Sequence, residues 1–343
     1  MAVQTKPALG NGHAPLDRAR RRLVQAGAAG LAAFALPWAA AQAGAAGADL
    51  SKASLRVASY KGGWRTLLKA AGLGDTPYNI DWKEFNSGVQ HIEAINAGAL
   101  DIGSGSEIPA VFAARTPGRV RIVSVAKGDL NNQAVFAQKE SSIRSIADLR
   151  GKRVGYVRAT TTHYFLQKML AEAGLSFQDI QAISLSPADG LSAFASGDFE
   201  AWAIYGYNGQ LARSQYGARV IKTSRGYLSG NFLSYANADT VADPLRQAAL
   251  ADLLRRLQKA TAWGVAHPEQ WAQAQSLETR VPAQALLALF HGRSHDDRIQ
   301  PIDDADIASH QEVANVFTQI GVLDGPVRVA PLWDRTFDRA LRA

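Results

Sequence analysis

The residues best suited to chemistry are three consecutive threonines, Thr160 to Thr162, followed directly by His163. An alternating, β-branched pattern over residues 153–157 predicts a strand before them, and apolar spacing from Phe165 onward predicts a helix after them. This order brings free N–H groups, hydroxyls and the positive end of a helix dipole together. It is typical of an anion-binding pocket, and a helix cap with a purely structural role is the alternative.

Two more turns of this kind are predicted earlier in the chain. Ser87 and Gly88 lie between a strand predicted over residues 78–85 and the start of a helix, and Gly105 and Ser106 follow a short buried strand. Ligands of parallel α/β sheets bind where strands end and helices begin. Both turns are therefore candidate binding positions.

Alternating strands and helices over most of the chain predict parallel sheets with helices on both faces. Extended passages near residues 131–138 and 228–236 connect two alternating units and predict a hinge. We therefore expect an α/β protein with two doubly wound lobes. Lobe 1 would comprise residues 54–132 and 234–343, and lobe 2 would comprise residues 133–233.

The N-terminal residues have the pattern of a bacterial export signal, which predicts a leader over residues 1–43. Arg20 to Arg22 precede an uncharged, alanine-rich run, and Ala41-Gln42-Ala43 has the small-x-small form of a cleavage site. The arginines followed by Leu23 and Val24 resemble the twin-arginine (Tat) pattern, with a Sec signal as the alternative. A membrane anchor is disfavoured because the run is shorter than the ~20 residues of a span. We expect a periplasmic protein.

The composition is that of a soluble globular protein of 343 residues, with 47% hydrophobic and 20% charged residues and no cysteine. Without cysteine, disulfides, thiolate metal sites and thiol nucleophiles are excluded. The leader carries four of the seven net positive charges, which leaves about +3 for the mature chain. Because no basic patch interleaves with aromatic residues, we expect no nucleic-acid partner.

Catalytic and metal-binding motifs are lacking. The sequence contains no G-x-S-x-G elbow and no Walker A motif, and the Gly103–Ile108 segment lacks the third glycine of a dinucleotide fingerprint. His291 and His295 have helical i, i+4 spacing, but the glycine and charged residues around them favour a polar turn. We expect no cofactor, no metal and no enzymatic activity. Trp64 and Trp202 lie at strand ends, where a cleft would be, with core packing as the alternative.

The sequence resembles the periplasmic binding proteins of ABC importers for sulfonates, taurine and nitrate, from about residue 54 to about residue 325. Three segments carry the resemblance: E-A-I-N-A-G-A-L-D-I-G-S-G-S-E-I-P, G-K-R-V-G-Y-V-R-A-T-T-T-H-Y, and S-P-A-D-G-L-S-A-F-A-S-G-D-F-E-A-W-A-I-Y. The resemblance implies a two-lobed type II binding fold that closes on an organic anion, a monomer, and a partner permease in the inner membrane. It also implies that helix N-termini and hydroxyls hold the anion, with Trp202 beside its organic part.

The sequence departs from the family at two places in the expected cleft. Ser106-Glu107-Ile108-Pro109 replaces G-D-T-P, and Tyr205-Gly206-Tyr207 replaces W-D-P. Tyr205, Tyr207 and Trp64 would suit a larger or aromatic ligand group. The expected ligand-binding residues are Trp64, Ser87, Gly88, Gly105, Ser106, Glu107, Thr160, Thr161, Thr162, His163, Trp202, Tyr205 and Tyr207.

Two alternatives to sulfonate binding remain open. Relatives bind nitrate, bicarbonate, riboflavin or pyrimidine precursors. Desulfinases and thiamine-pyrimidine synthases share the fold, and an enzyme of that type would here need a nucleophile such as Ser106 activated by a base such as His163.

Overall fold

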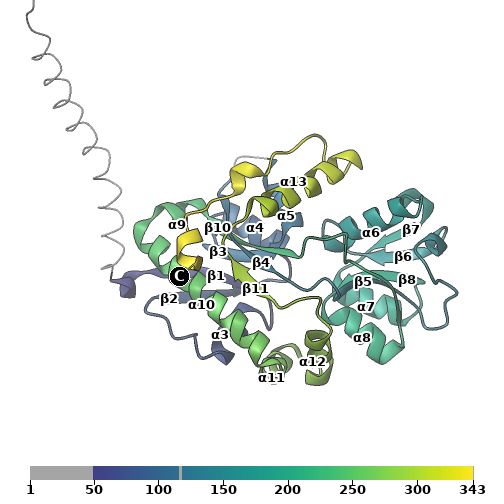
Figure 1. Ribbon diagram of the computed structural model, residues 1–343, viewed down its shortest axis with the longest axis horizontal. Coiled ribbons are helices and arrows are strands. Elements are labelled where there is room, and N and C mark those ends of the chain that lie inside the picture. Colours follow the sequence, from purple (N-terminus) through teal and green to yellow (C-terminus); the bar gives the residue numbers. More distant parts are fainter. Residues whose placement is uncertain (1–48, 116–117, 343) are drawn as a thin grey trace, which may run out of the picture. The chain divides into compact units, whose positions relative to one another are not determined.

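The computed structural model describes residues 49–115 and 118–342, which form two β-sheets with helices against both faces (Figure 1). The expected export leader, residues 1–43, lies outside the described residues. Within the described part, no helix combines the length and the apolar character needed to cross a bilayer. Short 3-10 helices occupy Leu50–Lys52, Ala147–Leu149, Phe177–Asp179 and Ala330–Leu332.

The first sheet consists of β1 (Ser54–Ser59), β2 (Asn79–Glu84), β3 (Ile102–Ser106), β4 (Val120–Lys127), β10 (Asn231–Asn237) and β11 (Arg298–Gln300). Its spatial order is β11-β4-β10-β3-β1-β2. β1 is parallel to β2 and β3, whereas β10 runs antiparallel between β3 and β4. The segments that supply these strands also form the helices α3 (Trp64–Ala70), α4 (Gly88–Asn96), α5 (Glu107–Ala113), α9 (Ala238–Ala242), α10 (Pro244–Ala266), α11 (Pro268–Thr279), α12 (Ala283–His291), α13 (Asp304–Gln319) and α14 (Asp338–Arg342).

β1, an inner strand of the first sheet, is buried over most of its length because both faces are covered. Val57 packs in a cluster with leucines of α10, whereas its neighbour Ala58 packs in a cluster with Ile95 of α4 on the other face. Successive side chains of a strand point to opposite faces, so a doubly covered strand needs an almost continuous apolar run. The doubly wound arrangement expected from the sequence is confirmed.

The second sheet consists of β5 (Gln133–Ala137), β6 (Arg153–Tyr156), β7 (Gln181–Ser184), β8 (Ala201–Tyr205) and β9 (Arg219–Thr223), in the order β7-β6-β8-β5-β9. Its helices are α6 (Thr161–Glu172), α7 (Pro187–Ala195) and α8 (Tyr207–Tyr216). α6 packs on one face, and α7 and α8 pack on the other, around a fully buried Trp202. The second lobe is therefore also doubly wound.

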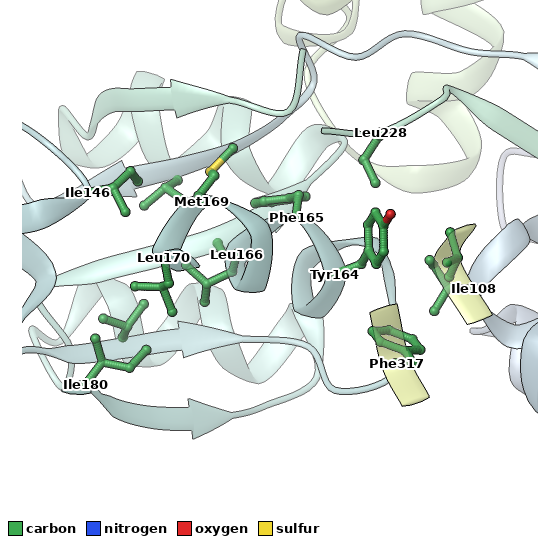
Figure 2. Close-up of a cluster of buried hydrophobic side chains, with 14 of the residues drawn as sticks. Ile108, Ile146, Tyr164, Phe165, Leu166, Met169, Leu170, Ile180, Leu228 and Phe317 are labelled. Carbon is green, nitrogen blue, oxygen red and sulfur yellow. The ribbon is translucent and has the colours of Figure 1, made fainter. Parts of the chain in front are cut away.

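One hydrophobic cluster includes elements from both halves (Figure 2). Tyr164 and Phe165 of α6 share it with Ile108 of α5 and Phe317 of α13. The Phe317 ring centroid lies 5.8 Å from that of Tyr164 in an edge-on arrangement, a favourable geometry for aromatic pairs. The two sheets are therefore joined by packing as well as by the chain itself.

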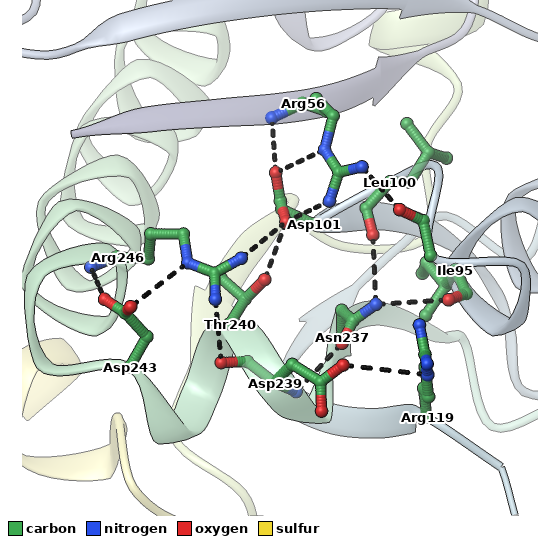
Figure 3. A network of polar contacts seen from close by, with 11 residues as sticks. Arg56, Ile95, Leu100, Asp101, Arg119, Asn237, Asp239, Thr240, Asp243 and Arg246 are labelled. Carbon is green, nitrogen blue, oxygen red and sulfur yellow. Dashed lines mark hydrogen bonds and ion pairs between the residues drawn. The ribbon is translucent and has the colours of Figure 1, made fainter.

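A buried carboxylate connects β1 to the loop that leads into β3 in the first sheet (Figure 3). Asp101 accepts hydrogen bonds from the Arg56 backbone at 2.7 Å, from the Arg56 guanidinium and from Thr240 at 2.7 Å. Burial raises the pKa of Asp101, but these hydrogen bonds outweigh it and hold the pKa below its usual value. This interaction ties β1, the loop before β3 and α9 together.

The chain passes between the sheets over residues 128–132 and returns over residues 224–230, slightly earlier than the passages expected at 131–138 and 228–236. The Gly128 N–H donates to the Gly230 carbonyl at 2.9 Å where the passages cross. Gly230 has a φ of 76°, and a Cβ there would lie 2.8 Å from the Gly128 carbonyl oxygen, so glycine is required. Residues 231–233, which were assigned to lobe 2 from the sequence, are strand residues of the first sheet.

Substituting Gly190 with alanine tests the packing beneath Trp202. A Cβ at Gly190 would lie 2.7 Å from Cζ2 of this fully buried indole, which has no free space to move into. We expect Gly190→Ala to lower the free energy of unfolding by about 1–3 kcal/mol, despite the better helix propensity of alanine. Urea denaturation measures the change, with Gly325→Ala as the control because no atom lies within 4 Å of a Cβ there. Equal stability of the two variants would contradict this packing.

Candidate functional site

The candidate site in the first sheet lies along the edge where its parallel strands end. Tyr60 follows β1, Ser87 follows β2, and Ser106 is the last residue of β3. β10 is antiparallel and begins at the same edge, where Phe232 pairs in register with Ser106. This is the edge at which α/β proteins bind ligands.

Two glycines allow the start of α4 to approach β3 closely. A Cβ on Gly88 would lie 3.2 Å from Cα of Gly105 and 3.3 Å from the Tyr60 hydroxyl oxygen, and a Cβ on Gly105 would lie 2.8 Å from the Tyr235 hydroxyl oxygen. Ser87 caps α4 by accepting a hydrogen bond from the Gln90 N–H at 3.3 Å. The first N–H groups of the helix are thus brought beside the Gly105–Ser106 turn.

In the second sheet, the three threonines after β6 have different roles. Thr160 caps α6, and its hydroxyl donates to the Val157 carbonyl at 2.8 Å. The fully buried Thr162 hydroxyl accepts from the Val157 N–H at 2.9 Å. Ala159, which lies in the turn between β6 and Thr160, has a φ of 57°, a strained conformation for a non-glycine residue. Two threonines therefore hold the turn, and Thr161 is left for other contacts.

Among the hydroxyls at these edges that have no hydrogen-bond partner in the described part of the chain, three are placed to act as donors. They belong to Thr161 of α6, Ser106 before α5 and Tyr205 at the end of β8. All three residues are half-buried, and none of these oxygens is among the buried, unsatisfied polar atoms. Each sheet therefore contributes a free, accessible hydroxyl donor.

The edges of the two sheets lie close together at two tyrosines. Burial raises the pKa of the Tyr60 phenol, and the nearby Tyr205 phenol raises it further. Burial also raises the pKa of Tyr205 to about 12, with a smaller contribution from Tyr207. Since such interactions fall off with distance, the end of β1 and the end of β8 lie within the range over which the two phenols affect each other.

Two exposed cations lie near these edges. Lys61 follows Tyr60, and Arg158 lies in the turn before Thr160; within residues 49–115 and 118–342, neither forms an ion pair. Exposed cations raise the local concentration of anions without the cost of burying a charge. The site can therefore attract an anion and hold it with neutral donors.

Two sequence predictions for tryptophans need correction. Trp202 does not border the site: it is fully buried, stacked 5.7 Å from Phe194 and packed over Gly190. Trp64 is half-buried at the start of α3 and packs against the core of the first sheet. Because both tryptophans lie at strand ends, the sequence predicted that they line a cleft. In the structure, each indole points toward a hydrophobic core instead.

Glu107 is also misplaced as a ligand residue. Its carboxylate is 3% exposed and accepts hydrogen bonds from Ser229 at 2.7 Å, Asn231 at 3.2 Å and Ser309. Burial raises the pKa of Glu107, although these donors and Lys127 oppose the shift. The side chain therefore anchors the returning passage, residues 224–230, instead of facing an anion.

His163 has a packing role. It is 6% exposed, and the rings of Tyr156, Phe177 and Phe317 surround it at 5.1–5.4 Å. Burial, helped by Arg158, lowers the pKa of His163 to about 4. In the region that the structure describes, the Ser106 hydroxyl donates to no side chain, so the nucleophile–base pair that the enzyme alternative would need is not formed.

The sequence analysis missed Tyr60, Phe232 and His91. Tyr60 donates to the Ser104 carbonyl at 2.9 Å, and its ring centroid lies 6.4 Å from that of Phe232 and 4.8 Å from that of His91. The strand end before the Gly62-Gly63 turn could have indicated Tyr60. Phe232 could not be found in this way, because it starts an antiparallel strand.

The arrangement suits the binding of an anion that carries a bulky organic group. Two helix N-termini, three free hydroxyls and exposed cations supply donors for negatively charged oxygens. Within the described ranges, no group of three or more His, Asp or Glu side chains is placed to hold a metal ion. These features define a class, the two-lobed type II binding proteins of the α/β fold.

Comparison with known proteins gives the family. The model of the NMT1/THI5-like family matches residues 78–271. The chain is 30% identical to a protein of Escherichia coli (strain K12) named as an aliphatic sulfonates-binding protein, over 80% of this chain and 86% of that one. The chain therefore belongs to the NMT1/THI5-like family, and its resemblance to the periplasmic sulfonate-binding proteins is confirmed.

Solved structures agree on the fold. The alkanesulfonate-binding protein SsuA of Xanthomonas axonopodis pv. citri, bound to MOPS, superposes with a TM-score of 0.73 and 25% identity, covering 83% of this chain and 99% of that one. The desulfurization enzyme DSZB shares the fold alone, with a TM-score of 0.60 and 16% identity over 85% of this chain and 99% of that one.

Buried histidines predict acid sensitivity. Burial lowers the pKa of His91 to about 4 and that of His310 to about 3. Between pH 6.5 and 4 the two imidazoles take up protons in the unfolded chain but stay neutral in the folded protein. The contribution of each histidine to the free energy of unfolding therefore falls as the pH falls through this range. We expect His91→Leu to reduce the slope of unfolding free energy against pH by up to about 1.4 kcal/mol per pH unit.

Urea denaturation at several pH values in this window measures the slope of the unfolding free energy. Glu107, whose raised pKa changes the slope in the opposite direction, is present in both proteins, so its effect cancels in the difference between wild type and variant. His310→Gln should reduce the slope independently, so the double variant should show both reductions. Parallel pH profiles for wild type and His91→Leu would contradict the prediction.

Proposed function

We propose that this protein is the periplasmic solute-binding component of an ABC import system, and that it binds a sulfonate or a related organic anion for delivery to a permease. The observation that carries the proposal is the set of free donors at the facing edges: the α4 start beside Gly88 and Gly105, and the hydroxyls of Ser106, Thr161 and Tyr205. The three oxygens of a sulfonate can each accept from such donors.

Supporting this function, the E. coli and Xanthomonas relatives are named for sulfonate binding. We propose export to the periplasm by a twin-arginine leader, action as a monomer, and lobe boundaries within the two passages, at residues 132/133 and 230/231. The first two proposals follow the sequence patterns described above. N-terminal sequencing of the exported protein would test the cleavage after Ala43.

The enzyme alternative has less support. The chain has no cysteine, and the pairing of Ser106 with His163 that a hydrolytic mechanism would need is not formed. A sulfite-release assay with the purified protein and no transporter separates the two functions. Release of sulfite from a bound sulfonate would overturn the binding-protein proposal.

A thermal-shift screen tests the ligand class. A ligand that binds only the folded state stabilises it by about 2.7 kcal/mol at a hundredfold excess over Kd. We expect sulfonates to raise the melting temperature, and nitrate, bicarbonate, riboflavin and pyrimidine precursors to have little effect. Stabilisation by one of these and not by sulfonates would change the ligand assignment.

The two neighbouring threonines provide a matched test of the anion site. We expect Thr161→Val to weaken sulfonate binding about tenfold, because a hydrogen bond to a charged group is lost, and to leave stability unchanged. Thr162→Val should instead lower the free energy of unfolding by about 1–3 kcal/mol, since it removes bonds to both polar groups of Val157. Calorimetric titration and urea denaturation measure the two effects. If Thr161→Val binds sulfonate as well as wild type, the threonines only cap the helix.

A further inference from the structure

Three of the exposed apolar side chains lie on or next to the elements that carry the free donors. The large apolar residues of the described chain that are more than a third exposed are Val89, Tyr207, Tyr216, Val220, Phe232 and Leu277. Val89 lies in the first turn of α4, Tyr207 begins α8, and Phe232 pairs with Ser106. Exposed apolar side chains that cluster, unlike isolated ones, mark binding surfaces.

Phe232 and Tyr60 form a fixed aromatic pair at the first edge. Phe232 is 39% exposed, and its ring is tilted by 60° to that of Tyr60. Tyr60 itself is held by its hydrogen bond to Ser104 and by the His91 ring beneath it. Because Phe232 lies across the ladder from Ser106, a ligand oxygen bonded to Ser106 would bring the group behind it within reach of these rings.

The second edge contributes aromatic surface opposite this pair. Tyr205 is the last residue of β8, and Tyr207, two residues later, begins α8 and is 42% exposed. Aromatic residues thus come from both lobes, as the free hydroxyls do. A ring between them would meet ring faces and edges at the distances that aromatic pairs favour.

None of the side chains proposed to contact the ligand offers a partner for a positive charge. Tyr60, Ser106, Thr161, Tyr205, Tyr207 and Phe232 are uncharged, and the Glu107 carboxylate is occupied by Ser229, Asn231 and Ser309. An ammonium group would therefore lose hydration without gaining a salt bridge. This disfavours aminosulfonates such as taurine.

We propose that the organic part of the ligand is an aromatic ring, so that the protein selects arylsulfonates over short alkanesulfonates and aminosulfonates. This inference rests on the proposed function, because the sulfonate group orients the ring. Four aromatic side chains, Tyr60, Tyr205, Tyr207 and Phe232, would contact the ring, and the free hydroxyls would hold the sulfonate oxygens.

Calorimetric titration of the purified protein with benzenesulfonate, ethanesulfonate and taurine tests the proposal. We expect benzenesulfonate to bind at least about tenfold more tightly than the other two, from aromatic contact and buried area. Equal or tighter binding of ethanesulfonate or taurine would overturn the aromatic assignment alone. If none of the three binds to folded protein, the proposed function fails as well.

Variants at exposed aromatic positions separate ring contact from a general effect. Phe232→Ala should weaken benzenesulfonate about tenfold and change ethanesulfonate little, and Phe232→Leu should lie between wild type and Phe232→Ala. Tyr216→Ala is the matched control, because Tyr216 is 40% exposed at the other end of α8 and should bind as wild type does. If Phe232→Ala weakens both ligands by the same factor, Phe232 does not contact a ring and the assignment is overturned.

Discussion

The crossing of the two passages between the sheets is the constraint on which the rest of the structure depends. The hydrogen bond from Gly128 to Gly230 depends on the glycine at position 230, which adopts a conformation that favours glycine and where a Cβ would lie 2.8 Å from the Gly128 carbonyl oxygen. With the passages joined there, β5 and β10 enter their sheets as antiparallel strands. Both therefore begin at the edges where the parallel strands end, and those edges face the same region.

In the proposed site, hydroxyls and helix N–H groups and not a buried cation would hold the anion, and the energetics favour this arrangement. A buried arginine would lose its hydration whenever the site is empty, whereas hydroxyls and helix N–H groups lose far less. Lys61 and Arg158 stay exposed and attract anions at a distance. The buried histidines near the edges remain neutral, since burial lowers their pKa, so they add no charge to the site at neutral pH.

The sequence predicted the fold better than the site. Period and capping signals located the strands and helices to within a few residues, because these signals are local. Side-chain direction depends on tertiary partners. Trp202 turns toward the core because Gly190 leaves room for it, and Thr160 and Thr162 turn inward to Val157. The threonine run predicts a capped helix start, and Thr160 does cap α6, but the local pattern could not tell which hydroxyl stays free.

The start of α5 connects the candidate site to the passages. Ser106 has a free hydroxyl at the edge, and the next residue, Glu107, sends its carboxylate to Ser229 and Asn231 on the returning strand. A movement that separated Ser229 from Glu107 would leave a buried carboxylate short of a donor, at a cost of about 1–3 kcal/mol. The position of Ser106 in the proposed site and the conformation of the returning passage are therefore linked through the Ser106–Glu107 peptide unit. In the observed arrangement of the sheets, the Glu107 carboxylate accepts hydrogen bonds from Ser229, Asn231 and Ser309.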